Sequence, residues 1–186
     1  MSATGGSGAA VLLTPGAGSD RDQPSLVLIE QLLAPVPVVR MDFPYRKAGR
    51  KVPDKAPVLL GAVAEEVAAM GAGRLVLGGR SMGGRMCSMA VAAGLPAVGL
   101  VLISYPLHPP GRPDRLRTEH FPLITVPCLF ISGTRDSFGS REELEEHTAL
   151  IPGDVVHVWL DGGDHGLRRK DQMVAETAAE WIRSVL

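Results

Sequence analysis

The stretch that decides the fold is LVLGGRSMGGR, residues 75–85. Three apolar residues, typical of a buried strand, are followed at once by a glycine-rich turn and by a helical pattern that starts at Met82. Gly79 and Gly83 stand two positions before and two positions after Ser81, which is the G-x-S-x-G spacing of a strained strand-to-helix turn. Side chains at these two positions would collide with neighbouring backbone, so the turn needs glycine there and lifts the Ser81 hydroxyl above the sheet edge.

This turn has more than one interpretation when it is taken alone. The chain holds 22 glycines, so a plain glycine-rich turn can show the same spacing. Glycines before a helix also cradle phosphates, but the P-loop lysine is absent and the glycines do not fit G-x-G-x-x-G. A serine at the start of a helix faces unpaired N–H groups. The pattern therefore favours a serine nucleophile, with the N–H of Met82 as a donor to the oxyanion.

Outward from residues 75–85, short apolar runs alternate with longer helical patterns. The expected strands are residues 11–13, 37–43, 74–78, 98–103, 127–132 and 155–160. The expected helices are residues 24–33, 56–70, 82–93, one that Ser140 and Glu143 begin as a capping box, and a last one with residues 174, 178, 181 and 185 on one face. Strand 98–103 has no polar alternation, as in strands buried on both faces. The pattern predicts an α/β domain with a mostly parallel sheet of about six strands and helices on both faces.

Length and charge narrow the class of protein. The chain has 186 residues and a formal net charge of −1, which fits one domain over residues 9–186 after a flexible lead-in at residues 1–8. This charge gives no reason to expect nucleic acid or an anionic membrane as a partner. No stretch approaches the roughly 20 apolar residues of a membrane span, and no signal peptide is recognised, so we expect a cytoplasmic protein. The oligomeric state is left open.

The two cysteines do not suggest a cofactor or a disulfide framework. Cys87 and Cys128 lie inside apolar runs, outside any CxxC or Cys/His cluster. We therefore expect two buried thiols, no metal site and no cofactor.

The residues for acid–base chemistry follow later strands, in the chain order serine, acid, histidine. Asp136 follows the strand at 127–132, and His165 follows the strand at 155–160 in a loop of small residues. His165 would take the proton of Ser81 and return it to the leaving group, while Asp136 would orient the imidazole and stabilise its charged form. Asp161 and Asp164 are rival acids, but their place in the histidine's own loop suits a role in shaping that turn.

The loop after the first strand is expected to supply the second oxyanion donor. Ala17 N–H is the preferred donor and Gly16 is its neighbour, whereas Pro15 has no N–H to donate. The alternative is a tight turn without a catalytic role.

These segments together resemble the small α/β-hydrolases without a cap that are related to dienelactone-hydrolase-like proteins. The resemblance is carried by residues 15–18, 41–45, 79–85, 105–111, 133–136 and 164–165. It implies an α/β-hydrolase fold with a reduced sheet and no lid domain. Relatives usually carry histidine in place of Pro15, and dienelactone hydrolases proper use a cysteine nucleophile, so Ser81 argues against that activity. Some relatives are subunits of chromatin-associated complexes.

The function expected from these features is that of a serine hydrolase, similar to a carboxylesterase or thioesterase, with an acyl-enzyme on Ser81. Residues 104–126 are too few for a helical lid domain, so the site is expected to be open to small esters or to exposed groups on larger molecules. Hydrolysis is expected to fall below about pH 6, where an ordinary imidazole base becomes protonated. Two alternatives stay open: an interaction module that keeps only the fold, and acyl transfer or perhydrolysis at the same residues.

Four residues are candidates for the rim of the site: Gly16, Tyr45, Arg80 and His108. For Arg80, a structural ion pair beneath the turn is expected before a substrate contact. A basic stretch over residues 46–55 follows the second strand. It is expected either to attract acidic substrates or, as the simpler reading, to be a solvated loop.

Overall fold

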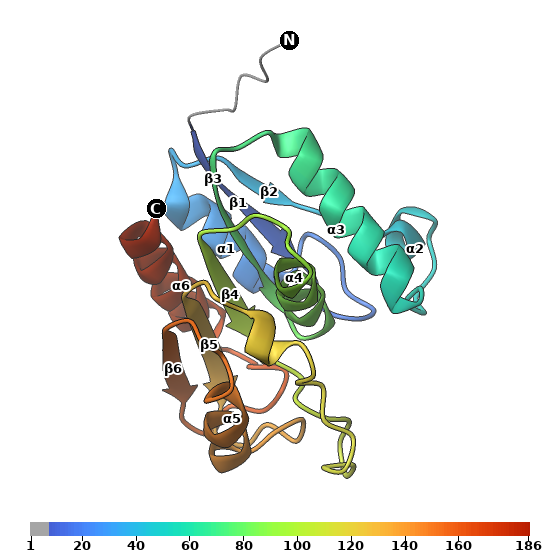
Figure 1. Ribbon diagram of the computed structural model, residues 1–186, viewed down its shortest axis with the longest axis vertical. Helices are drawn as coiled ribbons and strands as arrows, with labels where there is room; N and C mark the ends of the chain where they lie inside the picture. The colour runs from blue at the N-terminus through green and yellow to red at the C-terminus, as the bar shows by residue number, and fades with distance from the viewer. Residues whose placement is uncertain (1–7) are drawn as a thin grey trace.

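The computed structural model describes residues 8–186. A six-stranded parallel sheet lies at the centre of the fold (Figure 1). The strands are β1 (Ala9–Thr14), β2 (Val38–Arg40), β3 (Arg74–Arg80), β4 (Gly99–Ile103), β5 (Cys128–Gly133) and β6 (Val155–Leu160). Their order across the sheet is β2-β1-β3-β4-β5-β6, and every neighbouring pair is parallel. After β1, the chain adds β2 on one side of that strand and then crosses to add β3 on its other side. The carboxyl ends of β1 and β3 therefore lie beside each other where the strand order changes direction. This is where ligands bind in open α/β sheets.

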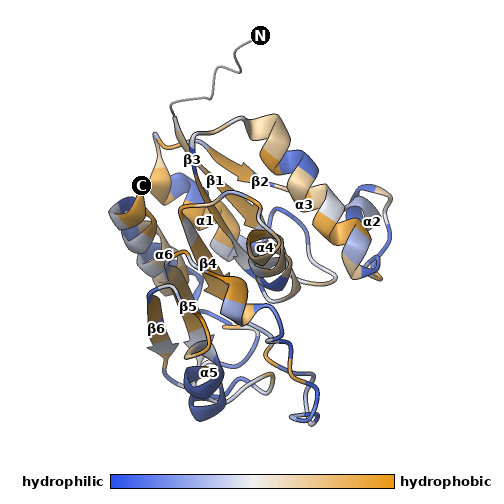
Figure 2. Ribbon diagram, in the orientation of Figure 1, coloured by the Kyte–Doolittle hydropathy of each residue, from blue (hydrophilic) through white to orange (hydrophobic). Residues whose placement is uncertain are grey.

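Helices cover both faces of this sheet, as the alternation of patterns predicts. They are α1 (Pro24–Leu33), α2 (Pro44–Lys47), α3 (Ala56–Met70), α4 (Met82–Ala92), α5 (Arg141–Thr148), α6 (Asp171–Val185) and the 3₁₀ turn η1 (Phe121–Leu123). Apolar side chains of α1 and α6 form one core layer, and those of α3, α4, α5 and η1 form the other. Figure 2 shows the contrast between the apolar strands and the largely polar α5.

Strand β4 shows why the central strands lack polar alternation. Leu100 and Leu102 belong to the core layer on the α4 side, whereas Val101 and Ile103 belong to the layer beneath α1 and α6. Each side chain is fully buried. Burial of an apolar side chain of this size stabilises a fold by roughly 1.5–3 kcal/mol, so both faces of β4 contribute to stability.

The second strand differs from the sequence-based prediction. Residues 37–43 were expected to form one strand, but β2 ends at Arg40 and residues 44–47 form the helical turn α2. Part of the reason is local: Pro44 fits the first position of a helix because its φ is fixed and it needs no N–H partner there. The flanking Phe43 and Tyr45 are fully buried in the core on the α3 side.

The connection between β4 and β5 contains no lid domain. Within residues 8–186, its one helical element is the three-residue η1. In the same described range, no helix has the length and apolar character required to cross a membrane. Cys87 and Cys128 are free and buried, and burial raises the pKa of each thiol to about 12. Most of the predicted 1–8 lead-in lies outside the described residues.

Candidate active site

Ser81 stands alone between β3 and α4 in a backbone conformation that side chains rarely adopt. Its φ is 49° and its ψ is −117°. A non-glycine residue in such a region costs of order 1–3 kcal/mol and persists where the surrounding structure enforces it. Here the enforcing contacts come from β1 and from the first turn of α4.

The two glycines around Ser81 allow this close packing. A Cβ atom on Gly79 would lie 2.0 Å from Oγ1 of Thr14, and one on Gly83 would lie 2.5 Å from the carbonyl oxygen of Pro15. The clash is with the end of β1 and the residue that follows it, elements that precede Ser81 by more than sixty positions. The sequence pattern indicated that glycine is needed at both sites, and the structure identifies the obstacle.

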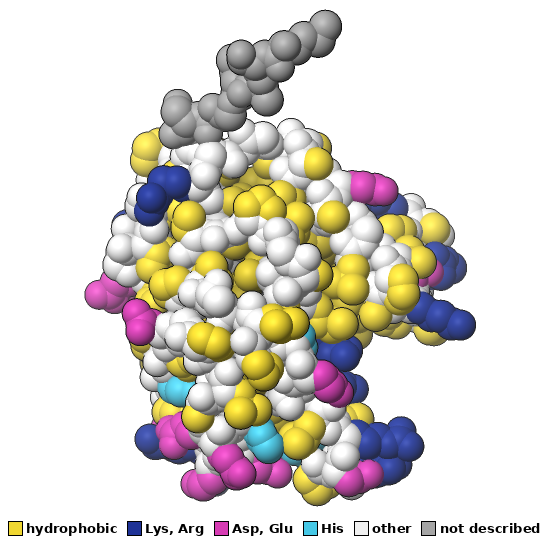
Figure 3. Space-filling view, viewed as in Figure 1, with side chains coloured by type: hydrophobic (Ala, Val, Ile, Leu, Met, Phe, Trp, Pro, Cys, Tyr) yellow, Lys and Arg dark blue, Asp and Glu magenta, His cyan; other side chains and the backbone are white. Residues whose placement is uncertain are grey.

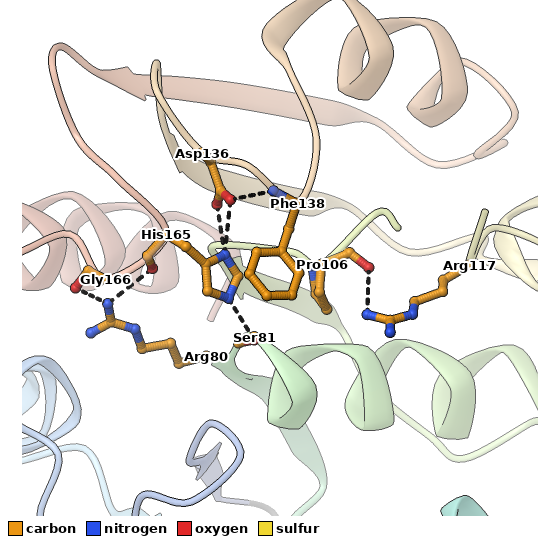
Figure 4. Close-up of polar contacts among 8 residues, drawn as sticks. All are labelled: Arg80, Ser81, Pro106, Arg117, Asp136, Phe138, His165 and Gly166. Atoms are coloured by element: carbon orange, nitrogen blue, oxygen red, sulfur yellow. Dashed lines mark hydrogen bonds and ion pairs between the residues drawn. The ribbon is translucent and has the colours of Figure 1, made fainter. Parts of the chain in front are cut away.

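Three side chains from different loops meet at this end of the sheet (Figure 4). Ser81 Oγ lies 2.8 Å from His165 Nε2. On the other side of the ring, His165 Nδ1 lies 2.8 Å from Oδ2 and 3.0 Å from Oδ1 of Asp136. A carboxylate can only accept a hydrogen bond, so this geometry requires the ring to donate from Nδ1. In the neutral ring, Nε2 is then free to accept from the serine hydroxyl.

Asp136 is held for this contact by its own turn. Its side chain is nearly buried, and Oδ1 also accepts a hydrogen bond from the N–H of Phe138 at 2.8 Å. The rival carboxylates do not reach the imidazole: Asp161 accepts from Thr134 Oγ1, and Asp164 is exposed and has no hydrogen bond to the ring among residues 8–186. The structure therefore brings Asp136, and neither rival, to His165.

Phe138 is a part of the site that the sequence analysis missed. Its ring stacks on the imidazole of His165, with centroids 3.8 Å apart and planes 25° apart. Two contacts therefore hold the imidazole: the carboxylate of Asp136 at one edge of the ring, and the Phe138 ring on one of its faces (Figure 4). A lone phenylalanine in a loop carries no periodic signal, and only the turn after β5 brings it over the histidine.

Arg80 anchors the loop that carries His165. Its guanidinium Nη2 donates to the carbonyl oxygens of His165 and Gly166. Burial lowers the pKa of Arg80, and the nearby carboxylates of Asp171 and Asp164 act in the opposite direction. The expected structural ion pair is wrong: among residues 8–186 no carboxylate lies within ion-pair distance, and two backbone carbonyls take that place because the arginine lies directly beneath their loop.

A cavity of about 600 Å³ opens over Ser81 and His165. Gly16, Ala17 and Met82 lie in its wall, as do Arg80 and Phe138. The N–H of Gly16 is engaged by the side chain of Gln23 at 3.3 Å, whereas the N–H of Ala17 has no acceptor among residues 8–186. Met82 is the first residue of α4, where N–H groups have no acceptor within the helix.

Two of the rim candidates do not line this cavity. Tyr45 is buried in the core, and its hydroxyl accepts a hydrogen bond from the N–H of Gly18 at 3.2 Å. His108 is also buried and lies near the α5 capping box, with Nε2 3.4 Å from Glu143 Oε2. Both placements correct the prediction, because these side chains support the loops around the cavity from behind.

The basic stretch at residues 46–55 is likewise absent from the cavity wall. Arg46 pairs with Asp20 at 3.1 Å, and Arg50 pairs with Asp54 at 2.8 Å. These contacts favour the solvated-loop reading. The arginines that do line the cavity come from β3, α4 and two loops: Arg80, Arg85, Arg117 and Arg168.

The sequence of this chain matches the model of a known protein family. The α/β-hydrolase domain family model matches residues 7–185. The chain belongs to this family. Residues 8–186 hold no group of three or more His, Cys, Asp or Glu side chains arranged to bind a metal ion.

Solved structures of α/β-hydrolases resemble this family member over nearly its whole length. Est1E from Butyrivibrio proteoclasticus shares 13% identity at a TM-score of 0.75, over 97% of this chain and 88% of its own. A monoacylglycerol lipase from Paleococcus ferrophilus shares 15% identity at a TM-score of 0.77, over 97% of both chains. A dienelactone hydrolase from Anabaena variabilis shares 19% identity at a TM-score of 0.73, over 98% of this chain and 88% of its own. At these identities the likeness establishes the fold.

Proposed function

We propose that this α/β-hydrolase is a serine hydrolase, similar to a carboxylesterase or thioesterase, that forms an acyl-enzyme on Ser81. One observation carries the proposal: the uninterrupted line of contacts from Ser81 Oγ through the imidazole of His165 to the carboxylate of Asp136. A scaffold without catalytic activity has no physical need for this arrangement on a strained turn that opens into a cavity.

In the first step, Ser81 Oγ attacks the carbonyl carbon of the ester while its proton passes to Nε2 of His165. The 2.8 Å separation of these atoms is within the reach required of a general base. Asp136 stabilises the imidazolium that forms and keeps the ring in the required tautomer. The carbonyl π electrons move to oxygen, which gives a tetrahedral oxyanion.

The donors that we propose for that oxyanion are two backbone N–H groups. They belong to Met82, at the N-terminus of α4, and to Ala17, in the loop after β1, and both residues line the cavity. Removal of one oxyanion donor in other hydrolases costs about 10²–10³ in kcat, so this pair would contribute substantially to the rate.

The tetrahedral intermediate then collapses to an acyl-enzyme, and water hydrolyses the acyl-enzyme. The bond from the carbonyl carbon to the leaving group breaks, and the leaving alkoxide or thiolate takes the proton from Nε2 of His165, which leaves an acyl ester on Ser81. Water next attacks that ester and gives one proton to Nε2. Collapse of the second oxyanion releases the acid, and Ser81 Oγ recovers its proton from the imidazole.

The experiment that tests this function is hydrolysis of short p-nitrophenyl esters, such as the acetate and the butyrate. We expect turnover by the wild-type protein and its loss in Ser81→Ala. Ser184→Ala is a matched control, because Ser184 is exposed on α6 and, within residues 8–186, its hydroxyl donates only to the carbonyl oxygen of Trp181. Hydrolysis at the wild-type rate by Ser81→Ala would contradict the proposal. So would a wild-type protein that hydrolyses none of the esters.

A further inference from the structure

The cavity over Ser81 has a strongly positive wall. Its lining includes four arginines, Arg80, Arg85, Arg117 and Arg168, and within residues 8–186 no aspartate or glutamate lines it. Figure 3 shows lysine and arginine side chains standing in the hollow between α2 and the loop that follows β4. Clefts lined by one sign of charge focus the electrostatic field and concentrate ligands of the opposite sign.

Two of these arginines, Arg85 and Arg117, are partly buried and have no carboxylate partner in the part of the chain that the structure describes. The charge of Arg80 is offset by nearby carboxylates, and its hydrogen bonds hold the His165 loop. Arg85 and Arg117, by contrast, form no ion pair with any carboxylate among residues 8–186, where Arg112 in the same loop as Arg117 does pair with Asp114. Arg168 also forms no ion pair among residues 8–186, but it is exposed, so water can solvate its charge more fully than the charges of the partly buried Arg85 and Arg117.

Arg85 lies immediately beside the serine. It is in the first turn of α4, and its backbone N–H donates to the carbonyl oxygen of Ser81 at 3.0 Å. Its Nε atom is buried and has no hydrogen-bond acceptor among residues 8–186. A buried donor without an acceptor costs roughly 1–3 kcal/mol, and more when the group is charged, so this guanidinium is left with an unmet requirement.

Arg117 faces the same cavity from the loop between β4 and β5. Its Nη1 donates to the carbonyl of Pro106 at 3.3 Å, which fixes the side chain against the wall on the other side of Phe138 from Arg80 (Figure 4). Burial lowers the pKa of Arg117, and the positive charge of Arg85 lowers it further. Two guanidinium groups repel each other in a partly buried site. An anion that binds between them is attracted to both, and this attraction offsets their repulsion.

We propose that Arg85 and Arg117 form an anion subsite beside Ser81, and that the substrate is an ester or thioester that also carries a carboxylate or phosphate group. The proposal rests on the proposed hydrolase function for its reaction and on the two arginines for its specificity. The guanidinium fork matches the paired oxygens of carboxylates and phosphates. The anion held there would orient the remainder of the substrate toward the serine hydroxyl, whose turn begins the same helix.

The test compares two esters that differ in one charge: the p-nitrophenyl monoester of adipic acid and its methyl-capped, neutral counterpart. We expect kcat/KM to favour the charged ester by about tenfold or more, the size of one charge-assisted hydrogen bond. Arg85→Gln and Arg117→Gln should each reduce this preference, the double variant should abolish it, and Arg117→Lys should retain part of it. Equal kcat/KM for the two esters, or a preference that survives in the double variant, overturns the proposal.

Arg115→Gln is the matched control, because Arg115 is exposed in the same loop and does not line the cavity. It should keep the full preference for the charged ester. Circular dichroism and thermal unfolding of every variant separate loss of the subsite from loss of the fold.

A binding measurement separates this inference from the proposed function. Adipate and inorganic phosphate are titrated separately into the wild-type protein at constant ionic strength and followed by calorimetry. Saturable binding of either anion that disappears in the double variant supports the subsite even if no ester is hydrolysed, and the anion that binds distinguishes a carboxylate from a phosphate substrate. Absence of binding by both anions overturns the subsite even if neutral esters are hydrolysed.

Discussion

His165 and Asp136, which follow the adjacent strands β6 and β5, are joined edge-on, with Nδ1 2.8 Å from Oδ2 and 3.0 Å from Oδ1. The carboxylate is nearly buried, and the imidazole is partly open to the cavity. The buried partner thus sets the ring orientation, and the exposed edge of the ring meets Ser81.

Asp136→Asn should lower kcat for p-nitrophenyl acetate by about 10⁴-fold, because an amide can present its NH₂ to Nδ1 and favour the wrong tautomer. Asp161→Asn is the control, since that carboxylate contacts Thr134 rather than the imidazole. Its kcat should stay close to the wild-type value. Equal losses in the two variants would show that the histidine loop as a whole, and not the Asp136 carboxylate, matters for the rate.

Phe138→Leu should lower kcat by about tenfold to a hundredfold, because loss of the 3.8 Å stack lets the imidazole move away from Ser81. Phe138 acts through His165, so it is a positioning residue. Its effect should appear in kcat with the thermal midpoint nearly unchanged, since the ring is only half-buried. Restoration of most of the rate in Phe138→Tyr would support stacking as the cause. An unchanged kcat in Phe138→Leu would remove this role.

The elements built from repeated local signals could be predicted from the sequence. Strand 98–103 and helix 24–33 are examples, because burial on both faces and a 3.6-residue apolar stripe leave direct traces in residue order. The prediction of strand 37–43 was wrong at its carboxyl end, because that boundary is not set by a repeated local signal alone. The switch from β2 to α2 depends on how Phe43 and Tyr45 pack into the core, which the local pattern does not contain.

The same distinction applies to the site. Ser81 stands out because its turn requires glycines at fixed spacing, and His165 and Asp136 follow from strand order. Arg117 and Phe138 belong to irregular loops without periodicity. The basic stretch at residues 46–55, where charges are adjacent in sequence, was expected either to attract acidic substrates or to be a solvated loop. The charges that line the cavity are adjacent only in space, so the sequence does not indicate them.

Gly83→Ala should destabilise the fold by about 2 kcal/mol or more, because the new Cβ would meet backbone of Pro15 that cannot move aside as a flexible side chain can. Gly61→Ala is a matched control in α3, where an added Cβ meets no atom within 4 Å. That variant should be stabilised by roughly 0.5–1 kcal/mol through helix propensity. Urea unfolding measures both. A neutral Gly83→Ala would contradict the packing described for the turn.

His120 should make the fold less stable in mild acid. Burial lowers the pKa of this imidazole to about 4, and the Arg85 charge contributes in the same direction. The unfolded chain, with an ordinary histidine pKa near 6.5, binds more protons between these values, so the free energy of unfolding falls as pH drops from about 6.5 to 4. The slope from this group is at most about 1.4 kcal/mol per pH unit, and less because the ring is partly exposed.

His120→Gln should flatten that dependence without removing it. Burial also lowers the pKa of His157, which remains in the variant. Urea unfolding at pH 7 and pH 5 is the measurement. An identical pH dependence in wild type and His120→Gln would contradict the assignment.

The most direct test of the central claim is covalent labelling with a fluorophosphonate probe, followed by peptide mass spectrometry. The probe needs a serine made nucleophilic by a neighbouring base. The geometry around Ser81 predicts one adduct per chain, located on Ser81, formed by the native protein, lost on unfolding and absent from Ser81→Ala. A native protein that stays unlabelled, or an adduct that maps to another residue and persists in Ser81→Ala, would contradict the account.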